Sequence, residues 1–433
     1  MKIAIAGFGV EGQANYRYWR ERFPEAEITV ADEQPIATDL LDDHVATIIG
    51  ESAFWHLNGF DLVVRTAGLA PRKIRTDGKV WSATNEFFDR CPAPIIGVTG
   101  SKGKGTTASL IASIAKADKR KVWLVGNIGL PSIEVLDSIA ADDLVVYELS
   151  SFQLWDAVKS PATAVVLYIE QEHLDVHDDM NDYVSAKANI ARHQQVDDRL
   201  IYLQTNEYSR RIADQSPAKL IGFPDEAGFH VADGKFRFGE EELAGVDSLR
   251  LPGEHNQLNA LAAIAAIYPL LHDKSVIPSG LSRFRGLAHR LQYVATIDEI
   301  EYYDDSIATT PSSAIAALRA FDDNRSKIIV LGGSSKGSDF SGLAEELLRQ
   351  PDARALLVGA EANRIAEACD AVGFVDYEIL VDQTMTSVVA RAAELSRAGG
   401  VVLLSPAAAS FGSYKNYIDR GLQYIEAVRA LGR

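Results

Sequence analysis

A glycine-rich stretch that begins at residue 100 carries the residue types that bind phosphate groups. It reads GSKGKGTT and consists of Gly100, Ser101, Lys102, Gly103, Lys104, Gly105, Thr106 and Thr107. An apolar run typical of a strand (residues 94–99) precedes it, and an apolar helical pattern (residues 108–117) follows it. In such a turn the backbone N–H groups converge, the helix N-terminus adds positive potential, and the lysine supplies a charge for the β- and γ-phosphates. We therefore predict a nucleotide phosphate loop, with Lys104 beside the phosphates.

The spacing of this stretch departs from the usual phosphate-loop pattern in two ways. Only two residues separate Gly100 from Gly103, and a glycine follows Lys104 at the position where a hydroxyl normally faces magnesium. The magnesium-facing hydroxyl is therefore expected one or two positions later, from Thr106 or Thr107.

A second glycine pattern, G-x-G-x-x-G, stands near the N-terminus. Gly7, Gly9 and Gly12 follow the strand-like residues 3–6, and Asp32 stands 20 positions after Gly12, at the end of another apolar run. This is the dinucleotide-binding fingerprint with its ribose acid in place, and alone it predicts an NAD-dependent dehydrogenase. Two phosphate sites on one chain fit a simple dehydrogenase poorly, so the dehydrogenase is kept only as an alternative.

Side chains that suit a metal ion follow farther along the chain. Glu148 ends a strand-like run, where a carboxylate can bind magnesium directly or through water. His173 and His177 have the i, i+4 spacing of a zinc site on a helix, but no third histidine or sulfur ligand stands nearby. The other interpretation is a single magnesium-associated His173, with Lys187 ten residues after His177.

The elements that must position these residues follow an alternating pattern. Short, continuously apolar stretches such as EITVAD, DLVVYELS and KIIVLGG alternate with amphipathic segments, as in parallel sheets with helices on both faces. The chain of 433 residues is longer than a domain with one ordinary hydrophobic core. Two prolines interrupt the pattern at residues 92 and 94, and hairpin-like alternation occurs at about residues 225–250 and again from residue 286.

From this pattern we predict an α/β protein with three domains. Residues 1–91 are expected to form a Rossmann-like domain and residues 92–285 a central P-loop ATPase-like domain with a mixed or parallel sheet. Residues 286–433 are expected to form a second Rossmann-like domain. Most of the polar motifs follow apolar strands, at the sheet edge where open α/β sheets bind ligands.

The bulk composition excludes several classes of protein. The net charge is −17, so general binding to nucleic acid or to an anionic membrane is not expected. The longest apolar runs are too short to span a bilayer, and the N-terminus reads as a strand rather than as a signal peptide. Two cysteines cannot form a disulfide framework. We expect a cytoplasmic protein and, because nothing in the sequence marks an interface, a monomer.

The order of the motifs resembles the Mur ligase family, the ATP-dependent amino-acid ligases of peptidoglycan precursor synthesis. The resemblance covers essentially the whole chain and rests on ELSSFQL, EHLDVH with a following AK, GEHNQLNALAA, GLAHRL, GGSSKGSDF and LLSPAAASFGSYKNYIDRG. These segments are similar to those of the members that add glutamate, usually D-glutamate, to UDP-N-acetylmuramoyl-L-alanine. The resemblance implies the same reaction, through an acyl phosphate and with ATP and Mg²⁺.

The resemblance also implies a role for each matching residue. Besides the phosphate loop, the residues expected at ATP are Asn259, His289, Arg290 and Asp305. Those expected at magnesium are Thr106, Glu148, His173 and Lys187, the last as a carbamylated lysine. Those expected at the UDP substrate are Gly7, Gly9, Val10, Glu11, Gly12, Asp32, Glu33 and Asn127. Those expected at glutamate are Thr309, Lys336, Ser410 and Tyr417. The catalytic set would be Lys104, Asn127, His173 and Lys187.

Some departures from the family pattern bear on the substrates. The family motif D-S-K-A-T-N reads DSIATT from residue 305, so Ile307 replaces a lysine near the amino-acid site, which leaves L-glutamate as an alternative to D-glutamate. Glu11 and Glu33 are acidic where UDP would bind. A folylpolyglutamate-synthase-like ligase is a further alternative, but such ligases lack the N-terminal UDP-binding domain that residues 1–91 resemble.

Overall fold

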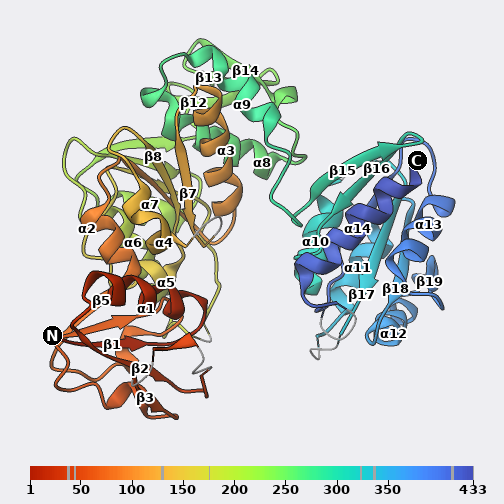
Figure 1. Cartoon of the computed structure of the whole chain (residues 1–433). Helices are drawn as coiled ribbons and strands as arrows, with labels where there is room; N and C mark the ends of the chain where they lie inside the picture. The colour runs from red at the N-terminus through yellow and green to blue at the C-terminus, as the bar shows by residue number, and fades with distance from the viewer. Residues whose placement is uncertain are drawn as a thin grey trace. The chain divides into compact units, whose positions relative to one another are not determined.

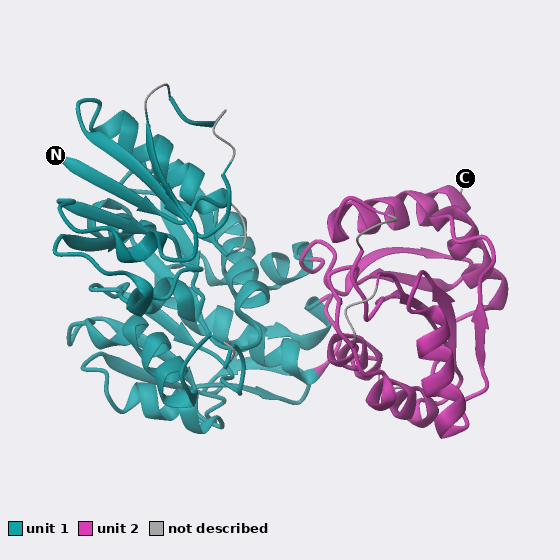
Figure 2. Ribbon diagram, turned by 90° about the horizontal axis from the view of Figure 1, so that it is seen from below, with its two compact units in different colours: residues 1–249, 254–284 teal, residues 250–253, 285–433 magenta. Residues whose placement is uncertain are grey.

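The structure is a computed structural model that describes residues 1–36, 40–42, 45–127, 131–174, 176–321, 324–334, 338–410 and 414–432. The chain forms two compact units (Figure 2). Unit 1 contains residues 1–249 and 254–284, and unit 2 contains residues 250–253 and 285–433. In both units, parallel strands alternate with helices along the chain (Figure 1). The predicted α/β class is therefore confirmed.

The first sheet of unit 1 has five parallel strands in the order β3-β2-β1-β4-β5. Residues 3–6 of the central strand are completely buried because both faces of the sheet are covered. Ile5 shares a core with Trp19 on one side, and Ala6 shares another core with Phe54 on the opposite side. The elements are β1 (Lys2–Ala6), α1 (Val10–Arg22), β2 (Glu27–Asp32), β3 (Ala46–Ile49), β4 (Leu62–Arg65), β5 (Lys79–Ser82) and α2 (Ala83–Arg90).

The second sheet of unit 1 has six parallel strands in the order β11-β10-β9-β6-β8-β7. Its strands are β6 (Ile95–Thr99), β7 (Val122–Gly126), β8 (Leu144–Glu148), β9 (Thr163–Val166), β10 (Arg199–Leu203) and β11 (Lys219–Phe223). Its helices are α3 (Lys104–Ala117), α4 (Ser132–Val135), α5 (Ser151–Leu154), α6 (Met180–Arg192), α7 (Glu207–Ala213), α8 (Glu254–Ile267) and α9 (Ile277–Arg283).

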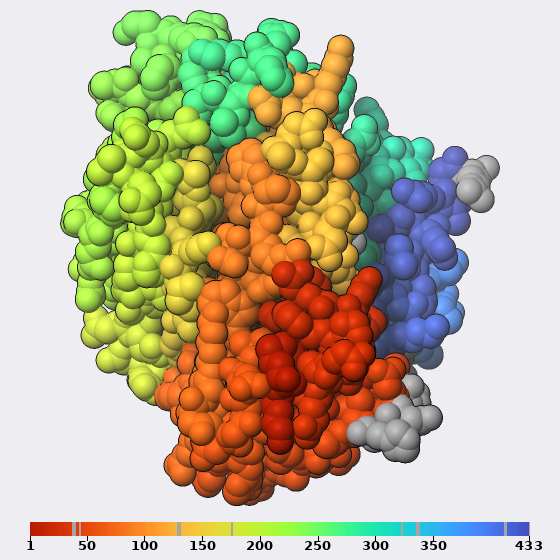
Figure 3. All heavy atoms as spheres, turned by 60° about the vertical axis from the view of Figure 1, so that its left-hand side comes forward, coloured from red at the N-terminus to blue at the C-terminus, as the bar shows by residue number. Residues whose placement is uncertain are grey.

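The two parallel sheets of unit 1 share one hydrophobic core. Phe87 of α2 and Tyr147 of β8 meet edge to face, with ring centroids 5.1 Å apart, and both rings are completely buried. In the space-filling view of Figure 3, the residues of the first sheet (red to orange) pack directly against those of the second (yellow to green). The glycine loops of both sheets therefore belong to one compact unit.

A small antiparallel sheet completes unit 1, in the region where hairpins were predicted. Its strands are β12 (Phe229–Ala232), β13 (Lys235–Phe238) and β14 (Glu241–Gly245). Helices α8 and α9 pack against α3, the helix that follows the phosphate loop. At the closest approach Gly280 of α9 lies against Ile114 of α3, and a Cβ at this glycine would stand 2.6 Å from the Ile114 Cα.

The sheet of unit 2 has six strands in the order β15-β16-β20-β17-β18-β19, of which β15 alone is antiparallel. Alternate residues of β17 face opposite helix layers, because Ile329 and Leu331 share a core with α10, α11 and α12, whereas Ile328 and Val330 share one with α13 and α14. The strands are β15 (Gln292–Ile297), β16 (Ile300–Asp304), β17 (Lys327–Gly332), β18 (Ala353–Val358), β19 (Tyr377–Ile379) and β20 (Val401–Leu404). The helices are α10 (Pro311–Arg319), α11 (Ser341–Arg349), α12 (Ala362–Val372), α13 (Met385–Leu395) and α14 (Tyr417–Leu431).

Short 3₁₀ turns connect several of these elements. They are η2 (Ala53–Trp55), η3 (Pro71–Lys73), η4 (Leu136–Ser138), η5 (Val246–Ser248), η6 (Tyr268–Leu270) and η7 (Lys274–Val276). Among the helices of the described ranges, none is both long and apolar enough to cross a membrane.

Candidate functional site

The predicted phosphate loop connects β6 to α3, as its sequence indicates. Gly103 is the N-cap of α3 and has φ 85°, a backbone conformation that glycine adopts without strain. Lys104, the first residue of the helix, folds back over the loop and donates from Nζ to the carbonyls of Gly100 and Ser101, at 3.0 and 2.8 Å. The loop therefore places one lysine ammonium and the N-terminus of a 14-residue helix beside each other.

Ser101 fixes the loop to the segment that follows β9. Its Oγ donates to the Glu170 carbonyl at 2.9 Å, accepts the Glu170 N–H at 3.0 Å, and lies 2.9 Å from the Tyr183 hydroxyl. The Ser101 hydroxyl is thus committed to contacts within the protein. Lys102 is exposed and forms long ion pairs of 3.6 Å with Glu170 and Glu172.

Asn259, which the family pattern puts at ATP, lies against the phosphate loop, although it is far away in the sequence. A Cβ on Gly103 would stand 2.2 Å from Asn259 Oδ1, so only a glycine fits at this point of the loop. The Thr107 hydroxyl is buried and donates to the Asn259 carbonyl at 3.4 Å. Thr106 is nearly buried in the same turn. The structure therefore uses the hydroxyl of Thr107 within the protein, to join α3 to α8.

Lys187 is the most unusual charged residue of unit 1. Its side chain is 1% exposed, its Nζ donates to the Gly100 carbonyl at 2.8 Å, and it lies 4.5 Å from the centre of the Tyr183 ring. Burial holds the pKa of Lys187 well below its ordinary value, and the charge of Lys104 lowers it further, whereas Glu172 and Glu148 act in the opposite direction. The structure thus brings Lys187 close enough to Lys104 and Glu148 for their charges to act on it.

Glu148 ends β8 at the same edge of the sheet. It is 2% exposed, and its backbone carbonyl accepts the Asn127 N–H at 3.2 Å. The Asn127 side-chain amide donates to Glu148 Oε1 at 3.5 Å. Asn127 follows β7, so the neighbouring strands β7 and β8 present an amide and a carboxylate side by side.

His173 lies in a loop, not on a helix. Its backbone has φ 58°, a left-handed conformation that costs a non-glycine residue about 1 kcal/mol or more. The carbonyl of His173 accepts the N–H groups of Val176 and His177, which closes the turn. Its ring lies 4.9 Å from the Phe152 ring, and Nε2 is 3.9 Å from a Glu172 oxygen.

The helical zinc pair of His173 and His177, the alternative that lacked a third ligand in the sequence, is not formed in the structure. Helix α6 begins only at Met180, and the His177 ring is already used within the protein. Its Nδ1 lies 2.9 Å from Asp182 Oδ2, and its Nε2 lies 3.0 Å from Ser151 Oγ. In the part of the chain that the structure describes, no three His, Cys, Asp or Glu side chains gather closely enough to hold a metal ion.

The loop of His173 and His177 is held from several sides. Asp182 of α6 also accepts the Asp178 N–H at 3.2 Å and the Trp155 indole N–H at 3.1 Å. On the side of the first sheet, Arg72 donates to the Val176 carbonyl at 2.5 Å, and it forms an ion pair of 2.9 Å with Asp178. These contacts determine where the backbone of His173 lies.

The N-terminal glycine loop has the expected Rossmann geometry. Gly7 has φ 91°, and a Cβ on Gly12 would stand 2.0 Å from the Gly7 carbonyl oxygen, so the turn is as tight as the fingerprint requires. Asp32 accepts the Phe8 N–H at 2.7 Å and the Gln34 N–H at 2.8 Å. Asp32 thus joins the loops that follow β1 and β2.

Glu11 points away from the glycine loop toward the end of β4. Its carboxylate accepts the Ala67 N–H at 2.9 Å, and burial raises the pKa of Glu11 above its ordinary value, although Ala67 and Arg65 act in the opposite direction. Arg65 is completely buried and holds Asp156, in the turn after α5, with bonds of 2.8 and 2.5 Å. Arg65 also donates to the Phe152 carbonyl at 2.9 Å.

Unit 2 contains the second group of predicted residues, beyond the carboxyl end of β16. His289 is buried, and its Nδ1 lies 2.7 Å from Asp304 Oδ2. Asp305 accepts the Ser405 hydroxyl at 2.6 Å and the Leu291 N–H at 3.1 Å. Burial raises the pKa of Asp305 to about 7. Arg290 is exposed on the same turn.

The residues expected at glutamate lie on loops of the same edge. Thr309 is half-buried after β16 and Ser410 is buried after β20. Tyr417 begins α14, and its carbonyl accepts the Ser306 hydroxyl at 2.8 Å. The structure therefore brings Thr309, Ser410 and Tyr417 to one end of the sheet of unit 2. Lys336 lies outside the described residues.

Two sequence regions of the chain match known families. Residues 98–267 match the Mur ligase middle domain, and residues 289–408 match the Mur ligase, glutamate ligase domain. The UDP-N-acetylmuramoylalanine--D-glutamate ligases of Acetivibrio thermocellus and Symbiobacterium thermophilum are 35% and 34% identical to the chain. The two alignments cover 99% of this chain and 96% and 98% of those proteins. The chain belongs to the Mur ligase family.

Solved structures of this family and beyond share the fold. The UDP-N-acetylmuramate-alanine ligase of Thermotoga maritima has a TM-score of 0.58 at 18% identity, and the match covers 99% of both chains. FolC of E. coli in complex with DHPP and ADP has a TM-score of 0.56 at 18% identity, covering 80% of this chain and 92% of that one. The two family models and the D-glutamate ligases confirm the resemblance to Mur ligases, and the full-length matches to these ligases argue against the dehydrogenase alternative.

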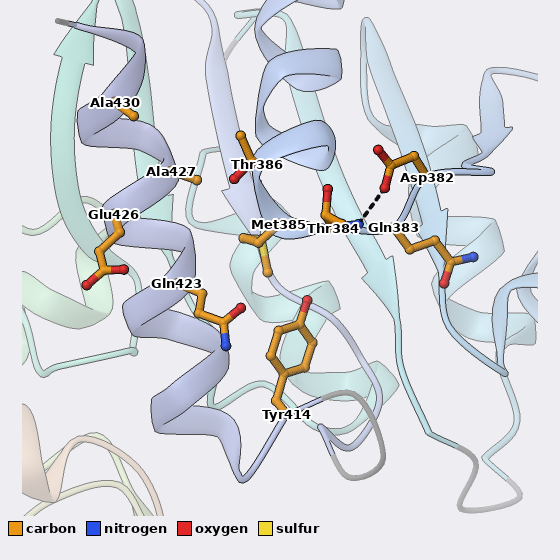
Figure 4. Close-up of a pocket in the computed structure, with 10 residues that line it drawn as sticks. All are labelled: Asp382, Gln383, Thr384, Met385, Thr386, Tyr414, Gln423, Glu426, Ala427 and Ala430. Atoms are coloured by element: carbon orange, nitrogen blue, oxygen red, sulfur yellow. Dashed lines mark hydrogen bonds between the residues drawn. The ribbon is translucent and has the colours of Figure 1, made fainter.

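A surface cavity of this Mur ligase lies in unit 2, between α13 and α14 (Figure 4). It has a volume of about 640 Å³. The Tyr414 ring points between the two helices, and on the far side of Thr384 from it Asp382 accepts the Thr384 N–H at 3.0 Å. A smaller cavity, which Tyr414 also lines, is bounded by Ser410 and by Gly333 and Ser334 after β17. Of the predicted site residues that the structure describes, only Ser410 lines either cavity.

Sequence reasoning missed several residues that hold the site together. Tyr183 contacts both Ser101 and Lys187, and its place four residues before Lys187 on one helix was a usable signal. The contacts of Arg65 and Asp182 join segments whose proximity no local pattern reveals. The contacts of Arg420 in unit 2, described below, also join segments that are far apart in the sequence.

Proposed function

We propose that this Mur ligase joins glutamate to UDP-N-acetylmuramoyl-L-alanine in an ATP-dependent reaction, with D-glutamate as the amino acid. The observation that carries the proposal is the arrangement of the phosphate loop, where Lys104 and the buried Lys187 both donate to the Gly100 carbonyl near Glu148. The D-glutamate ligases to which the chain is similar along its whole length support the choice of substrates.

The three substrates are assigned to three parts of the chain. Residues 1–91 would bind the UDP substrate, residues 92–285 the ATP phosphates and magnesium, and residues 286–433 the amino acid. We also propose that the protein works in the cytoplasm as a monomer. Asn259 beside the phosphate loop supports its role at ATP. His289, Arg290 and Asp305 are also proposed at ATP, because they match the family pattern.

The residues around the phosphate loop fit magnesium. Glu148 supplies a carboxylate of the kind that magnesium prefers, and Thr106 supplies the hydroxyl after Lys104, because the hydroxyl of Thr107 is used within the protein. Lys187 fits a carbamate, since its low pKa favours the neutral amine, which can attack carbon dioxide. With His173, the carbamate would hold a second magnesium. Bound there, the metal would neutralise charge on the transferring phosphoryl group.

The mechanism follows from the anionic reactants. The terminal carboxylate of the UDP substrate attacks the γ-phosphorus of ATP, the bond to the β,γ-bridging oxygen breaks and ADP leaves. The resulting acyl phosphate gives a poor electrophile a leaving group. Lys104 and the N–H groups of the loop oppose the repulsion between the two anions. The amine of glutamate then attacks the acyl carbon, and phosphate leaves from the tetrahedral intermediate.

The N-terminal glycine loop fits a diphosphate without requiring NAD. The turn between Gly7 and Gly12 lets a diphosphate approach the N-terminus of α1. Glu11 does not oppose this, because its carboxylate turns toward Ala67 and the charge of Arg65. Asp32, and Glu33 beside it, are proposed at the sugar or base of UDP.

The experiment that tests the proposal measures phosphate release from ATP in the presence of UDP-N-acetylmuramoyl-L-alanine and either glutamate enantiomer. We expect release that requires the UDP substrate and D-glutamate. Release with L-glutamate alone would move the assignment to the other enantiomer, which the isoleucine at position 307 leaves as the alternative. Release with neither enantiomer would overturn the substrate assignment.

A further inference from the structure

Arg420 is a completely enclosed arginine at the ligand-binding edge of unit 2. It lies on α14, and 2% of the residue is exposed. Its Nε donates to the Ser306 hydroxyl at 2.9 Å and Nη2 donates to the Ser306 carbonyl at 2.8 Å. Nη1 and Nη2 both donate to the Ala408 carbonyl, at 3.2 and 3.3 Å. One guanidinium therefore ties the loop after β16 to the loop after β20.

The loop that follows β17 approaches the same guanidinium. Gly333 has φ 152°, and a Cβ there would stand 3.2 Å from Arg420 Nη1 and 2.2 Å from the Ala409 carbonyl oxygen. The next residue, Ser334, donates its N–H to the Ala409 carbonyl at 2.8 Å. Three loops thus meet at Arg420, and two of them carry Thr309 and Ser410 of the predicted glutamate set.

The positive charge of Arg420 is retained in this enclosed place. Burial lowers the pKa of Arg420 to about 10, and Asp304 opposes that effect, so the guanidinium is charged at neutral pH. Within the described residues, no carboxylate forms an ion pair with Arg420 at 4.0 Å or less. The guanidinium instead lines the smaller cavity of unit 2, together with Gly333, Ser334 and Ser410.

The packing of α14 leaves the guanidinium little freedom to move. The residue after Arg420 is Gly421, where a Cβ would stand 2.1 Å from His289 Nδ1 and 2.7 Å from Asp304 Oδ2. The helix therefore lies directly on the end of β16. A lysine could supply the charge, but not the planar fork that reaches two carbonyls and a hydroxyl at once.

We propose that Arg420 is a positioning residue for the amino-acid substrate. Arg420 sets the spacing of the three loops that hold glutamate, and its guanidinium adds positive charge to the cavity that these loops enclose. The inference rests on the proposed function, because it takes glutamate as the ligand of these loops. Among the residues that the structure describes, none of the hydrogen bonds of Arg420 reaches a residue proposed at ATP or at the UDP substrate, so we expect its effect on the amino acid.

The test compares the full-length wild type with Arg420→Lys, Arg420→Met and Ser306→Ala, using Arg429→Lys as the control. Arg429 is an exposed arginine on the same helix. We expect the KM for glutamate to rise roughly tenfold or more in Arg420→Lys and Ser306→Ala, since each loses charged hydrogen bonds. Their KM values for ATP and the UDP substrate should stay within about twofold of the wild type. The control should match the wild type.

Two outcomes would overturn the inference. One is a wild-type KM for glutamate in both Arg420→Lys and Ser306→Ala, and the other is a parallel rise of all three KM values. Thermal unfolding of each variant shows whether the variant is folded. If Arg420→Met does not fold, Ser306→Ala still tests the loop contact, because this variant keeps the charge of Arg420. A wild type that releases no phosphate with either glutamate enantiomer would instead refute the proposed function, and the inference with it.

Discussion

At the scale of single residues, burial makes one acid of unit 2 unusually sensitive to pH. The carboxyl of Asp305 is enclosed between Ser405 and the backbone of Leu291, and burial raises its pKa from 3.8 to about 7. The folded protein therefore binds this proton more tightly than the unfolded chain does. The stability that comes from the protonated carboxyl is fully present below about pH 4 and is lost as the pH rises through about 7.

We expect Asp305→Asn to remove this part of the pH dependence. The neutral amide keeps the shape of the side chain, so the free energy of unfolding of the variant should fall less than that of the wild type between pH 4 and 8. The pH-dependent part of the free energy of unfolding that Asp305 contributes corresponds to about 4 kcal/mol. Urea unfolding of both proteins across this range measures it. The control is Asp298→Asn, at an exposed turn of the same unit; equal slopes for Asp305→Asn and wild type would contradict the prediction.

At the scale of elements, the loop before α6 shows how buried hydrogen bonds place a side chain that they do not touch. His177 joins Ser151 of α5 to Asp182 of α6, and its backbone N–H bonds to the carbonyl of His173. His173 itself is largely exposed and has a strained backbone. The position of the proposed metal ligand thus depends on the buried histidine four residues later.

We expect His177→Ala to destabilise the protein by about 1–3 kcal/mol, because it removes the buried partner of the Ser151 hydroxyl and one of the partners of Asp182. The variant should also need about 10-fold or more magnesium for half-maximal phosphate release, as is typical when support for a metal ligand is lost. Thermal unfolding and a magnesium titration measure the two effects. His193→Ala, at the exposed end of α6, is the matched control. A wild-type magnesium requirement in His177→Ala would refute the role of the loop.

How much of the molecule the sequence predicts depends on how local the signal is. The glycine loops after β1 and β6, the hairpin of β15 and β16, and the carboxylate at the end of β8 were all predicted, because each follows from a run of neighbouring residues. The strands β3, β5, β10 and β11 were not named in advance. β3 and β5 have only four residues each, and the residues of β3 are largely exposed, so their apolar pattern is weak.

The side-chain contacts of the site were less predictable. The spacing of His173 and His177 suggested a helix, but the actual partners of His177 come from segments 26 residues before it and five after it. Arg65 and Asp156 are 91 residues apart, and Arg420 and Ser306 are 114 apart. Pairs of this kind depend on which strands become neighbours, and a single sequence does not show that.

At the scale of the whole molecule, the residues of the proposed reaction divide by chemical step. The phosphate loop, Glu148 and Lys187 belong to unit 1, whereas Ser410, Tyr417 and Arg420 belong to unit 2. The first step, phosphoryl transfer to the UDP substrate, needs no amino acid. The second step, attack by the glutamate amine, needs no new contact to ATP. Variants of the phosphate loop and variants of the glutamate loops should therefore fail at different steps.

The exchange of oxygen-18 between the bridging and non-bridging positions of ATP, measured without glutamate, reports the first step alone. We expect Lys104→Ala to lose this exchange and the glutamate-dependent phosphate release alike, each by a factor of about 100 or more, because the variant removes the charge that stabilises the transferred group. Ser410→Ala should keep the exchange within about threefold of the wild type, while its glutamate-dependent release falls. If Ser410→Ala instead lost exchange and release to the same degree, the amino-acid loops of unit 2 would also be needed for phosphoryl transfer, and the division of the reaction between the phosphate loop and the glutamate loops would be wrong.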